Sequence, residues 1–84
     1  MNASKKYEPI NCSLYDYLEM WSIKKIPVHI HYQEGDNSQM VEHDFIFDLQ
    51  TKNKEEFVFL NSGKVIRLDN IIRINEIDFT VRSC

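Results

Sequence analysis

The stretch from Val28 to Asn37 reads VHIHYQEGDN, and it indicates a β fold. Its apolar residues Val28, Ile30 and Tyr32 alternate with polar ones, which is the period of a strand with one buried face. Its last four residues have the composition of a tight turn, so we expect a hairpin here.

The segment from Gln39 to Leu49 supplies the returning strand of this hairpin. Strict alternation puts five side chains on one face, namely Val41, His43, Phe45, Phe47 and Leu49. The other face then carries three acids with one apolar residue among them, namely Glu42, Asp44, Ile46 and Asp48. Because the segment is long for a single strand, we expect a bend or a bulge within it.

Further β segments follow this hairpin. A charged loop at 51–55 leads to strands at 56–60 and 64–68, which a short glycine-containing turn joins. A single helical turn near 68–71 and a last strand within 72–81 complete the pattern. Five to six short antiparallel strands with tight turns favour a small barrel, because closure removes exposed sheet edges.

The segment before the strands predicts a helix. Ser13 is a suitable N-cap, and Asp16 is the acid three residues later, as in a capping box. The apolar side chains follow at helical spacing and share one face, namely Leu14, Tyr17, Leu18 and Trp21. Tyr15, Asp16 and Glu19 fall away from that face and are expected to be exposed. Since Pro27 cannot continue a helix, we expect the helix to end shortly before it.

One helix followed by these strands is the order of an Sm-like or SH3-like barrel. An OB-type barrel is the alternative, although its helix usually lies inside the strand order. We therefore predict a mainly β single domain over residues 1–84. It has a flexible N-terminus at 1–6, a lead-in and helix at 7–25, and the barrel at 26–81.

The composition also indicates a compartment. No apolar run has the form of a signal peptide or a membrane span, so we expect a cytoplasmic protein. In a reducing compartment Cys12 and Cys84 are expected to be free thiols, with a bridge between them as the lesser alternative.

Charge is unevenly distributed along the chain. The formal net charge is −3, yet the stretch 26–51 contains no lysine or arginine. Its charged residues are all acidic, namely Glu34, Asp36, Glu42, Asp44 and Asp48. Such a region repels a phosphate backbone and attracts basic surfaces. A solvated sheet face is the simpler explanation for the charge distribution alone.

The sequence gives little support to catalysis or metal binding. His29 and His31 share one strand face and His43 lies on the next strand, and zinc accepts three histidines and a water. No fourth ligand is evident, and alternation assigns His43 to the apolar set, so we expect no metal site. The chain has neither a nucleophile–base signature nor a Gly-rich phosphate loop. We therefore expect no enzyme and no cofactor.

Direct RNA binding is an alternative that the sequence leaves open. A small barrel that binds RNA needs a basic or aromatic platform. Lys52, Lys54 and Lys64 are few and are interleaved with Glu55 and Glu56. A protein partner is therefore the preferred hypothesis, and an Sm-like module that binds RNA directly is the second.

Three segments together resemble a known family. The first runs Tyr7-x-Pro9-Ile10-Asn11-Cys12-x-x-Tyr15-Asp16-x-Leu18-Glu19. The second is Asp48-Leu49, leading through a lysine-bearing loop to Glu56-Phe57-Val58, and the third is Ile66-Arg67-Leu68-Asp69-Asn70-Ile71. In this order they are similar to the Rho-binding antiterminator family, the Rof-like bacterial proteins.

The resemblance implies a helix plus an Sm-like barrel that binds the transcription termination factor Rho. Proteins of this family cover the primary RNA-binding sites on the N-terminal domain of Rho, which reduces termination. An acidic helix competes for such a basic site as a phosphate mimic. The positions that match the motif, Tyr15, Asp16 and Glu19, are the expected contacts, and Lys52, Asn53 and Lys54 correspond to a second contact region. Helix capping is the rival explanation for Asp16.

Overall fold

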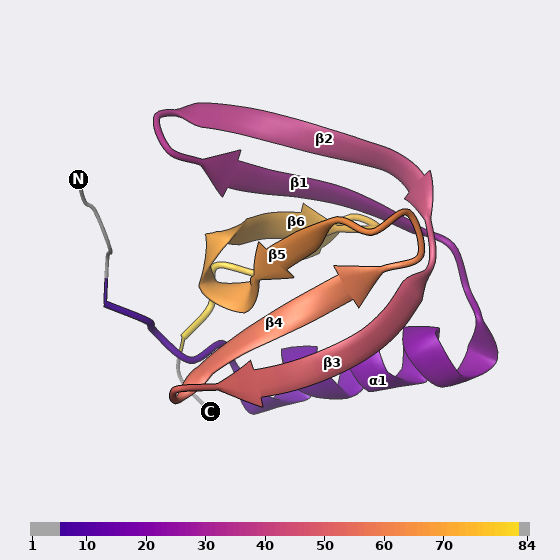
Figure 1. The fold of residues 1–84 in the computed structure, drawn as a ribbon, viewed down its shortest axis with the longest axis horizontal. Coiled ribbons are helices and arrows are strands. Elements are labelled where there is room, and N and C mark those ends of the chain that lie inside the picture. Colours follow the sequence, from indigo (N-terminus) through magenta and orange to yellow (C-terminus); the bar gives the residue numbers. More distant parts are fainter. Residues whose placement is uncertain (1–5, 83–84) are drawn as a thin grey trace.

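The computed structural model describes residues 6–82 (Figure 1). The helix α1 (Cys12–Lys24) precedes β1 (Val28–Glu34), β2 (Asn37–Asp44), β3 (Ile46–Lys52) and β4 (Glu55–Leu60). The chain continues through β5 (Val65–Arg67), the 3₁₀ helix η1 (Leu68–Asn70), β6 (Ile71–Ile74) and β7 (Ile77–Asp78). The prediction of a mainly β fold with one N-terminal helix is confirmed. The predicted flexible segment 1–6 lies outside the described residues, except for Lys6.

The strands form two antiparallel sheets. One has the order β2-β1-β6-β7 and the other has the order β3-β4-β5. Strand β2 continues around Phe45 into β3, so one long segment contributes to both sheets (Figure 1). The bend predicted within 39–49 is therefore confirmed. This bend, and a turn at Asn75 and Glu76 between β6 and β7, divide the predicted five to six strands into seven within residues 6–82. The Sm-like assignment stays a prediction.

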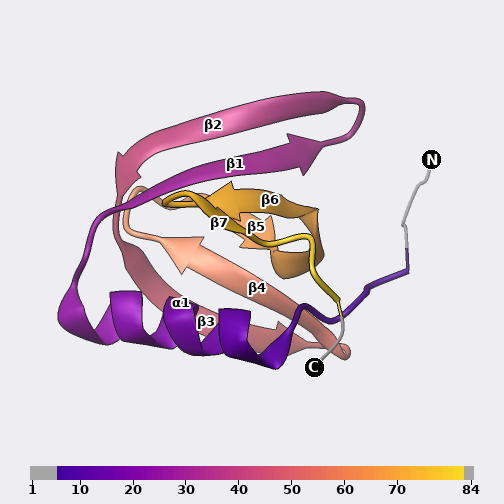
Figure 2. The same cartoon turned by 180° about the vertical axis from the view of Figure 1, so that it is seen from behind.

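The hydrophobic core lies between the two sheets, and α1 covers it. Fully buried side chains come from all three parts, namely Leu18 of α1, Ile30 and Ile74 of the first sheet, and Val58 of the second. Figures 1 and 2 show α1 beside β3, on the side of the molecule away from the β1–β2 hairpin.

In the bent segment, the side chains that point toward the core are not the ones expected from strict alternation. Phe45 and Phe47 are 36% and 71% exposed, whereas Ile46 is buried at 6%. The pairing register shifts once between β1 and β2, opposite Val28 and Ile30, and once between β3 and β4, around Ile46 and Asp48. Each shift reverses which side chains point inward, because the side-chain period of a strand is two. The two reversals leave Val41 and Leu49 against the core but turn Phe45 and Phe47 outward.

The helix begins two residues earlier than its predicted N-cap implies. Asn11, not Ser13, is the N-cap, and its side-chain Oδ1 accepts a hydrogen bond of 2.8 Å from the Ser13 N–H. Both residue types cap helices well, so the sequence offered two candidates. At the other end Lys25 adopts a left-handed conformation, and the Ile26 N–H donates to the Trp21 carbonyl at 3.0 Å, which ends the helix before Pro27.

The predicted apolar face of α1 is largely confirmed. Leu14, Leu18 and Trp21 are buried in the core. Tyr17 differs, since it is 40% exposed and its ring stacks on Trp21 at a centroid distance of 5.5 Å. No helix within residues 6–82 is of a length and apolarity to cross a membrane.

The expectation of free thiols is wrong for Cys12. This first residue of α1 is disulfide-bonded, and no described cysteine is free. The chain has one other cysteine, Cys84, which lies outside the described residues. Next to Cys12, the Asn11 N–H donates to the Val81 carbonyl at 3.2 Å, so the C-terminal segment runs beside the start of the helix.

Candidate partner-binding site

The outer side of α1 carries three of the predicted site residues, Tyr15, Asp16 and Glu19, which we call the helix face. Asp16 and Glu19 are exposed, as expected. The expectation was wrong for Tyr15, which is half-buried because its ring packs against the core. Within residues 6–82, neither the Asp16 nor the Glu19 carboxylate forms a hydrogen bond or an ion pair. These two charges are therefore available to a partner.

Capping does not account for Asp16. The first turn of α1 contains no acidic residue, because the N-cap is Asn11 and Asp16 lies in the second turn. A capping-box acid stands three residues after the cap, which here is the position of Leu14. The rival explanation for Asp16 therefore loses its geometric basis.

The helix face lies close to two further carboxylates. Burial raises the pKa of the Tyr15 phenol above its usual value, and the nearby charges of Glu56, Glu19 and Asp48 raise it further. The hydroxyl therefore keeps its proton at neutral pH and is able to donate a hydrogen bond. Sequence reasoning did not include Asp48 or Glu56 in the site, because they come from β3 and β4 and reach Tyr15 only through the tertiary fold.

The remaining predicted site residues, Lys52, Asn53 and Lys54, are exposed at the β3–β4 turn, which we call the hairpin tip. Lys52 pairs with Glu55, so Asn53 and Lys54 form a two-residue turn with φ angles of 52° and 65°. Two positive φ angles define the type I′ turn, in which asparagine followed by glycine is preferred. Asn53 suits its position, but Lys54 occupies the place where glycine is favoured.

The helix face and the hairpin tip lie at the same end of the molecule. Both Figure 1 and Figure 2 show the β3–β4 turn near the start of α1 and the segment that leads into it. The two regions are separated in sequence by β1 and β2, which lie across the molecule from α1 (Figures 1 and 2). The fold thus brings the two groups of predicted residues onto one end.

A buried network fixes the lead-in against the second sheet. The Arg67 Nε and Nη2 donate to both carboxylate oxygens of Asp69 at 2.7 and 3.0 Å, and the Asp69 side chain is 0% exposed. The Glu8 N–H donates to the same carboxylate at 3.1 Å, which attaches the lead-in to it. The Arg67 guanidinium also lies over the Tyr7 ring at 5.6 Å. A fully buried carboxylate is stable here because it is bidentately paired and further hydrogen-bonded.

The histidines do not converge on one point. The rings of His29 and His43 approach to a centroid distance of 6.1 Å, and His43 meets the edge of Phe45 at 5.6 Å. Across residues 6–82 no group of three or more histidine, cysteine, aspartate or glutamate side chains is arranged to hold a metal ion.

Comparison with known families decides the assignment. The family described as "Modulator of Rho-dependent transcription termination (ROF)" matches residues 9–80. The chain belongs to this family. None of the curated proteins matches the chain.

The residues that match the ROF family include the whole candidate site. The matched residues include α1 with its helix face, the hairpin tip, and the Arg67–Asp69 pair. The family is one of regulators of termination rather than of known enzymes. Sequence reasoning listed Tyr7, Arg67 and Asp69 as motif residues without a role, and the structure shows that they hold the lead-in to α1 in place.

Proposed function

We propose that this protein binds Rho on its N-terminal RNA-binding domain, covers the primary RNA-binding site, and thereby lowers Rho-dependent termination in the bacterial cytoplasm. Besides the match to the ROF family, one structural observation supports the proposal. The helix face presents Asp16 and Glu19 with no hydrogen-bond or ion-pair partner among the described residues. The protein acts by occupying a site, without catalysis or a cofactor.

Charge mimicry is the physical basis of this competition. A protein site that binds RNA is basic, because neutralising phosphates supplies most of the affinity. The carboxylates of Asp16 and Glu19 occupy the place of phosphates and pair with lysine or arginine of Rho. Tyr15 beside them adds an aromatic ring and a protonated hydroxyl, and such side chains often anchor interfaces.

The hairpin tip provides a second contact of opposite charge. Lys52 and Lys54 extend from a turn whose backbone is fixed by the β3–β4 pairing. Their ammonium groups reach acidic or carbonyl groups on Rho, while the helix face meets basic ones. A surface with both signs sets the orientation of the complex, because only one docking pose pairs both groups.

A competition assay tests the proposal. Rho is mixed with labelled oligo-C RNA, and the anisotropy of the RNA is followed as the protein is added. We expect the RNA to be released, and the release to weaken as salt rises. A pull-down at low salt in which Rho does not bind the protein would refute the proposal.

Two variants with the same change of charge sharpen the assay. Asp16→Lys is expected to weaken binding to Rho by on the order of 2–5 kcal/mol, as for reversal of a desolvated charge pair. Asp36→Lys changes the same charge on the exposed β1–β2 turn, away from α1, and leaves binding nearly unchanged. Equal losses for the two variants would indicate a nonspecific charge effect. Titrating the labelled RNA with the protein alone tests direct RNA binding.

A further inference from the structure

Two of the most exposed apolar side chains of this protein border adjoining hollows between α1 and β3. Ile23 of α1 is 79% exposed and Phe47 of β3 is 71% exposed. A single exposed apolar residue is ordinary in a monomeric protein. Two large ones beside a common groove form an apolar surface that a partner is able to cover.

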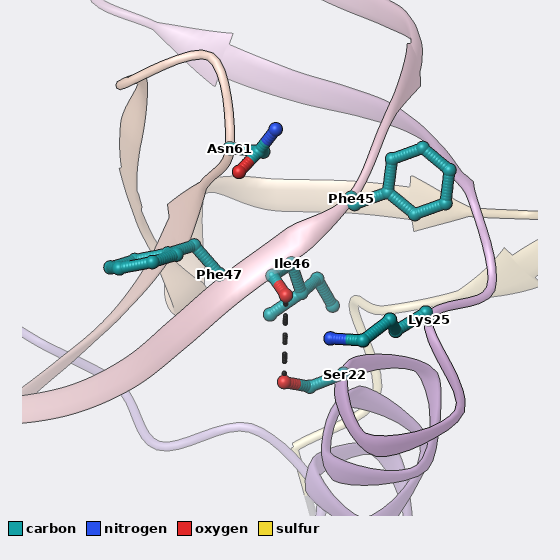
Figure 3. Close-up of a pocket in the computed structure, with 6 residues that line it drawn as sticks. All are labelled: Ser22, Lys25, Phe45, Ile46, Phe47 and Asn61. Carbon is teal, nitrogen blue, oxygen red and sulfur yellow. Dashed lines mark hydrogen bonds between the residues drawn. The ribbon is translucent and has the colours of Figure 1, made fainter.

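The groove runs between α1 and β3. One part, of about 440 Å³, is lined by Ser22, Lys25, Phe45, Ile46, Phe47 and Asn61 (Figure 3). The adjoining part, of about 250 Å³, lies between α1 and the next residues of β3, and its lining includes Ser22, Ile23, Asp48 and Leu49. Ser22 borders both parts, and residues from Phe45 to Leu49 line them in order along the same side of α1. We call the two adjoining parts together the α1–β3 groove.

The fold holds both walls of the groove in place. The Ser22 hydroxyl donates to the Ile46 carbonyl at 3.5 Å, which joins helix to strand (Figure 3). Figure 3 shows Phe45 and Phe47 on either side of Ile46 along the strand. The two register shifts described above turn the phenylalanines outward while Ile46 remains buried. The Phe47 ring is therefore presented on β3, and the Phe45 ring on the bend just before it.

The charges at the ends of the groove indicate what covers it. Tyr15, Glu19 and Asp48 border one end, which is part of the helix face and its acidic surroundings. Lys25 borders the other end. A complementary surface therefore carries basic groups, then apolar groups, then an acidic or carbonyl group. A protein surface supplies this sequence of groups, whereas a nucleic acid presents phosphates to the acidic end.

We propose that Ile23 and Phe47 form the apolar centre of the interface with the same partner, and that the interface extends from the helix face along the α1–β3 groove. This inference rests on the proposed function, because it assumes that the surface filling the groove belongs to Rho. Large apolar and aromatic anchors at the centre of an interface commonly supply affinity, while rim charges set orientation and association rate. The helix face then steers the partner, and the groove holds it.

Binding kinetics of two substitutions at the groove test the inference. Phe47→Ser and Ile23→Ser remove the two anchors from exposed positions, so thermal melting is expected to stay close to that of the wild type. Each variant raises the Kd for Rho by on the order of 30-fold, the threshold of an interface hot spot. The loss appears in the dissociation rate and changes little with salt. Asp16→Lys, in contrast, changes the association rate as well as the dissociation rate, and its loss depends on salt.

A matched control comes from the first sheet. Met40 on β2 is 59% exposed, and Met40→Ser removes a similar apolar surface away from the groove. We expect its Kd for Rho to stay within about twofold of the wild-type value, as for surface substitutions away from an interface.

The outcomes separate this inference from the proposed function. If Asp16→Lys weakens binding but Phe47→Ser and Ile23→Ser do not, the groove is not part of the interface and the proposed function stands. If the wild type does not bind Rho, both are overturned. If sedimentation shows a dimer that Phe47→Ser dissociates, a second copy fills the groove. If Phe47→Ser instead removes binding of RNA to the protein alone, RNA fills it, and either result overturns the inference.

Discussion

The Tyr7 hydroxyl donates a hydrogen bond of 2.7 Å to the Glu56 carboxylate, across 49 positions of sequence. Tyr7 belongs to the lead-in of α1, and Glu56 lies on β4 just after the hairpin tip. The bond therefore connects the two regions that carry the candidate site. Together with the Arg67–Asp69 pair, whose guanidinium lies over the Tyr7 ring, this contact fixes how the helix face sits relative to the hairpin tip.

We predict that Tyr7→Phe lowers the free energy of unfolding by about 1–2 kcal/mol, because the half-buried Glu56 loses a hydrogen bond to its carboxylate. Denaturant titration measures the change. Tyr17→Phe is the control, since among residues 6–82 the Tyr17 hydroxyl makes no hydrogen bond and its ring stays stacked on Trp21. Equal stability of Tyr7→Phe and the wild type would contradict the prediction.

The same hydroxyl gives the protein a sensitivity to alkaline pH. Burial, and then the bond to Glu56, raise the pKa of Tyr7 above its ordinary value of 10.0. Above pH 10 the unfolded chain loses the phenol proton while the folded chain keeps it, so stability falls as pH rises. Below that pH both states hold the proton, and the contribution is fully present.

Melting experiments between about pH 8 and pH 11 test this dependence, since they span the ordinary tyrosine pKa. We expect the wild type to lose more stability above pH 10 than Tyr7→Phe does, because the variant lacks the phenol whose pKa is raised. The burial and the neighbouring carboxylates of Tyr15 raise its pKa in the same direction, so a smaller loss persists in the variant. Parallel curves for the two proteins would count against the role of Tyr7.

The roles of Asn11 and Asp16 separate in a second pair of variants. Asn11→Ala removes the side chain that caps α1 and is expected to lower stability by about 1 kcal/mol. Asp16→Ala removes an exposed carboxylate and is expected to change stability by less than about 0.5 kcal/mol. If thermal melting shows the opposite order, Asp16 has a structural role and the helix face loses one of its charges.

Cys12, the first residue of α1, is disulfide-bonded. We predict that Cys12→Ser lowers the free energy of unfolding by about 2–5 kcal/mol under oxidising conditions, the usual range for losing a native bridge from a small domain. Under reducing conditions the variant and the wild type should unfold alike. A difference that persists after reduction would mean that the side chain acts through packing instead.

Local periodicity predicted the parts of this fold that depend on neighbouring residues. Helical spacing placed Leu14, Leu18 and Trp21 in the core, and alternation buried Val28, Ile30 and Tyr32. The burial of these side chains depends only on the periodicity of a single helix or strand, and that periodicity can be read from the sequence.

The sequence did not predict features that depend on the pairing register of strands or on contacts between segments far apart in the chain. Phe45 and Phe47 were assigned to the face of Val41 and Leu49, but two register shifts reverse them. A shift depends on how the bent strand fits two partners at once, and a single-strand pattern carries no signal for it. The meeting of Tyr7 with Glu56 likewise depends on chain closure.

The candidate site divides in the same way. The exposure of Asp16 and Glu19 was predictable from helical spacing, whereas the proximity of Asp48 and Glu56 to Tyr15 was not. Carboxylates on separate strands converge only when the sheet lies against the helix. The binding role of all these residues stays a prediction.

Two turns of the same kind allow the hairpin tip to be tested without disturbing the fold. Lys54 and Glu76 both occupy the second position of a two-residue turn, with φ angles of 65° and 70°. A left-handed conformation is unfavourable for residues with a Cβ atom, and glycine relieves it. We predict that Lys54→Gly and Glu76→Gly each raise the free energy of unfolding by about 0.5–1 kcal/mol, less than the full left-handed cost because glycine loses more entropy on folding.

Only one of these two variants should affect binding. Lys54→Gly removes an ammonium from the hairpin tip, so its affinity for Rho is expected to fall several-fold while its stability rises. Glu76→Gly gains the same stability at the β6–β7 turn, and its affinity should match the wild type. Parallel denaturant titrations and binding measurements on the two variants check both effects. If Lys54→Gly becomes more stable and binds Rho as tightly as Glu76→Gly does, the Lys54 side chain makes no contact with the partner.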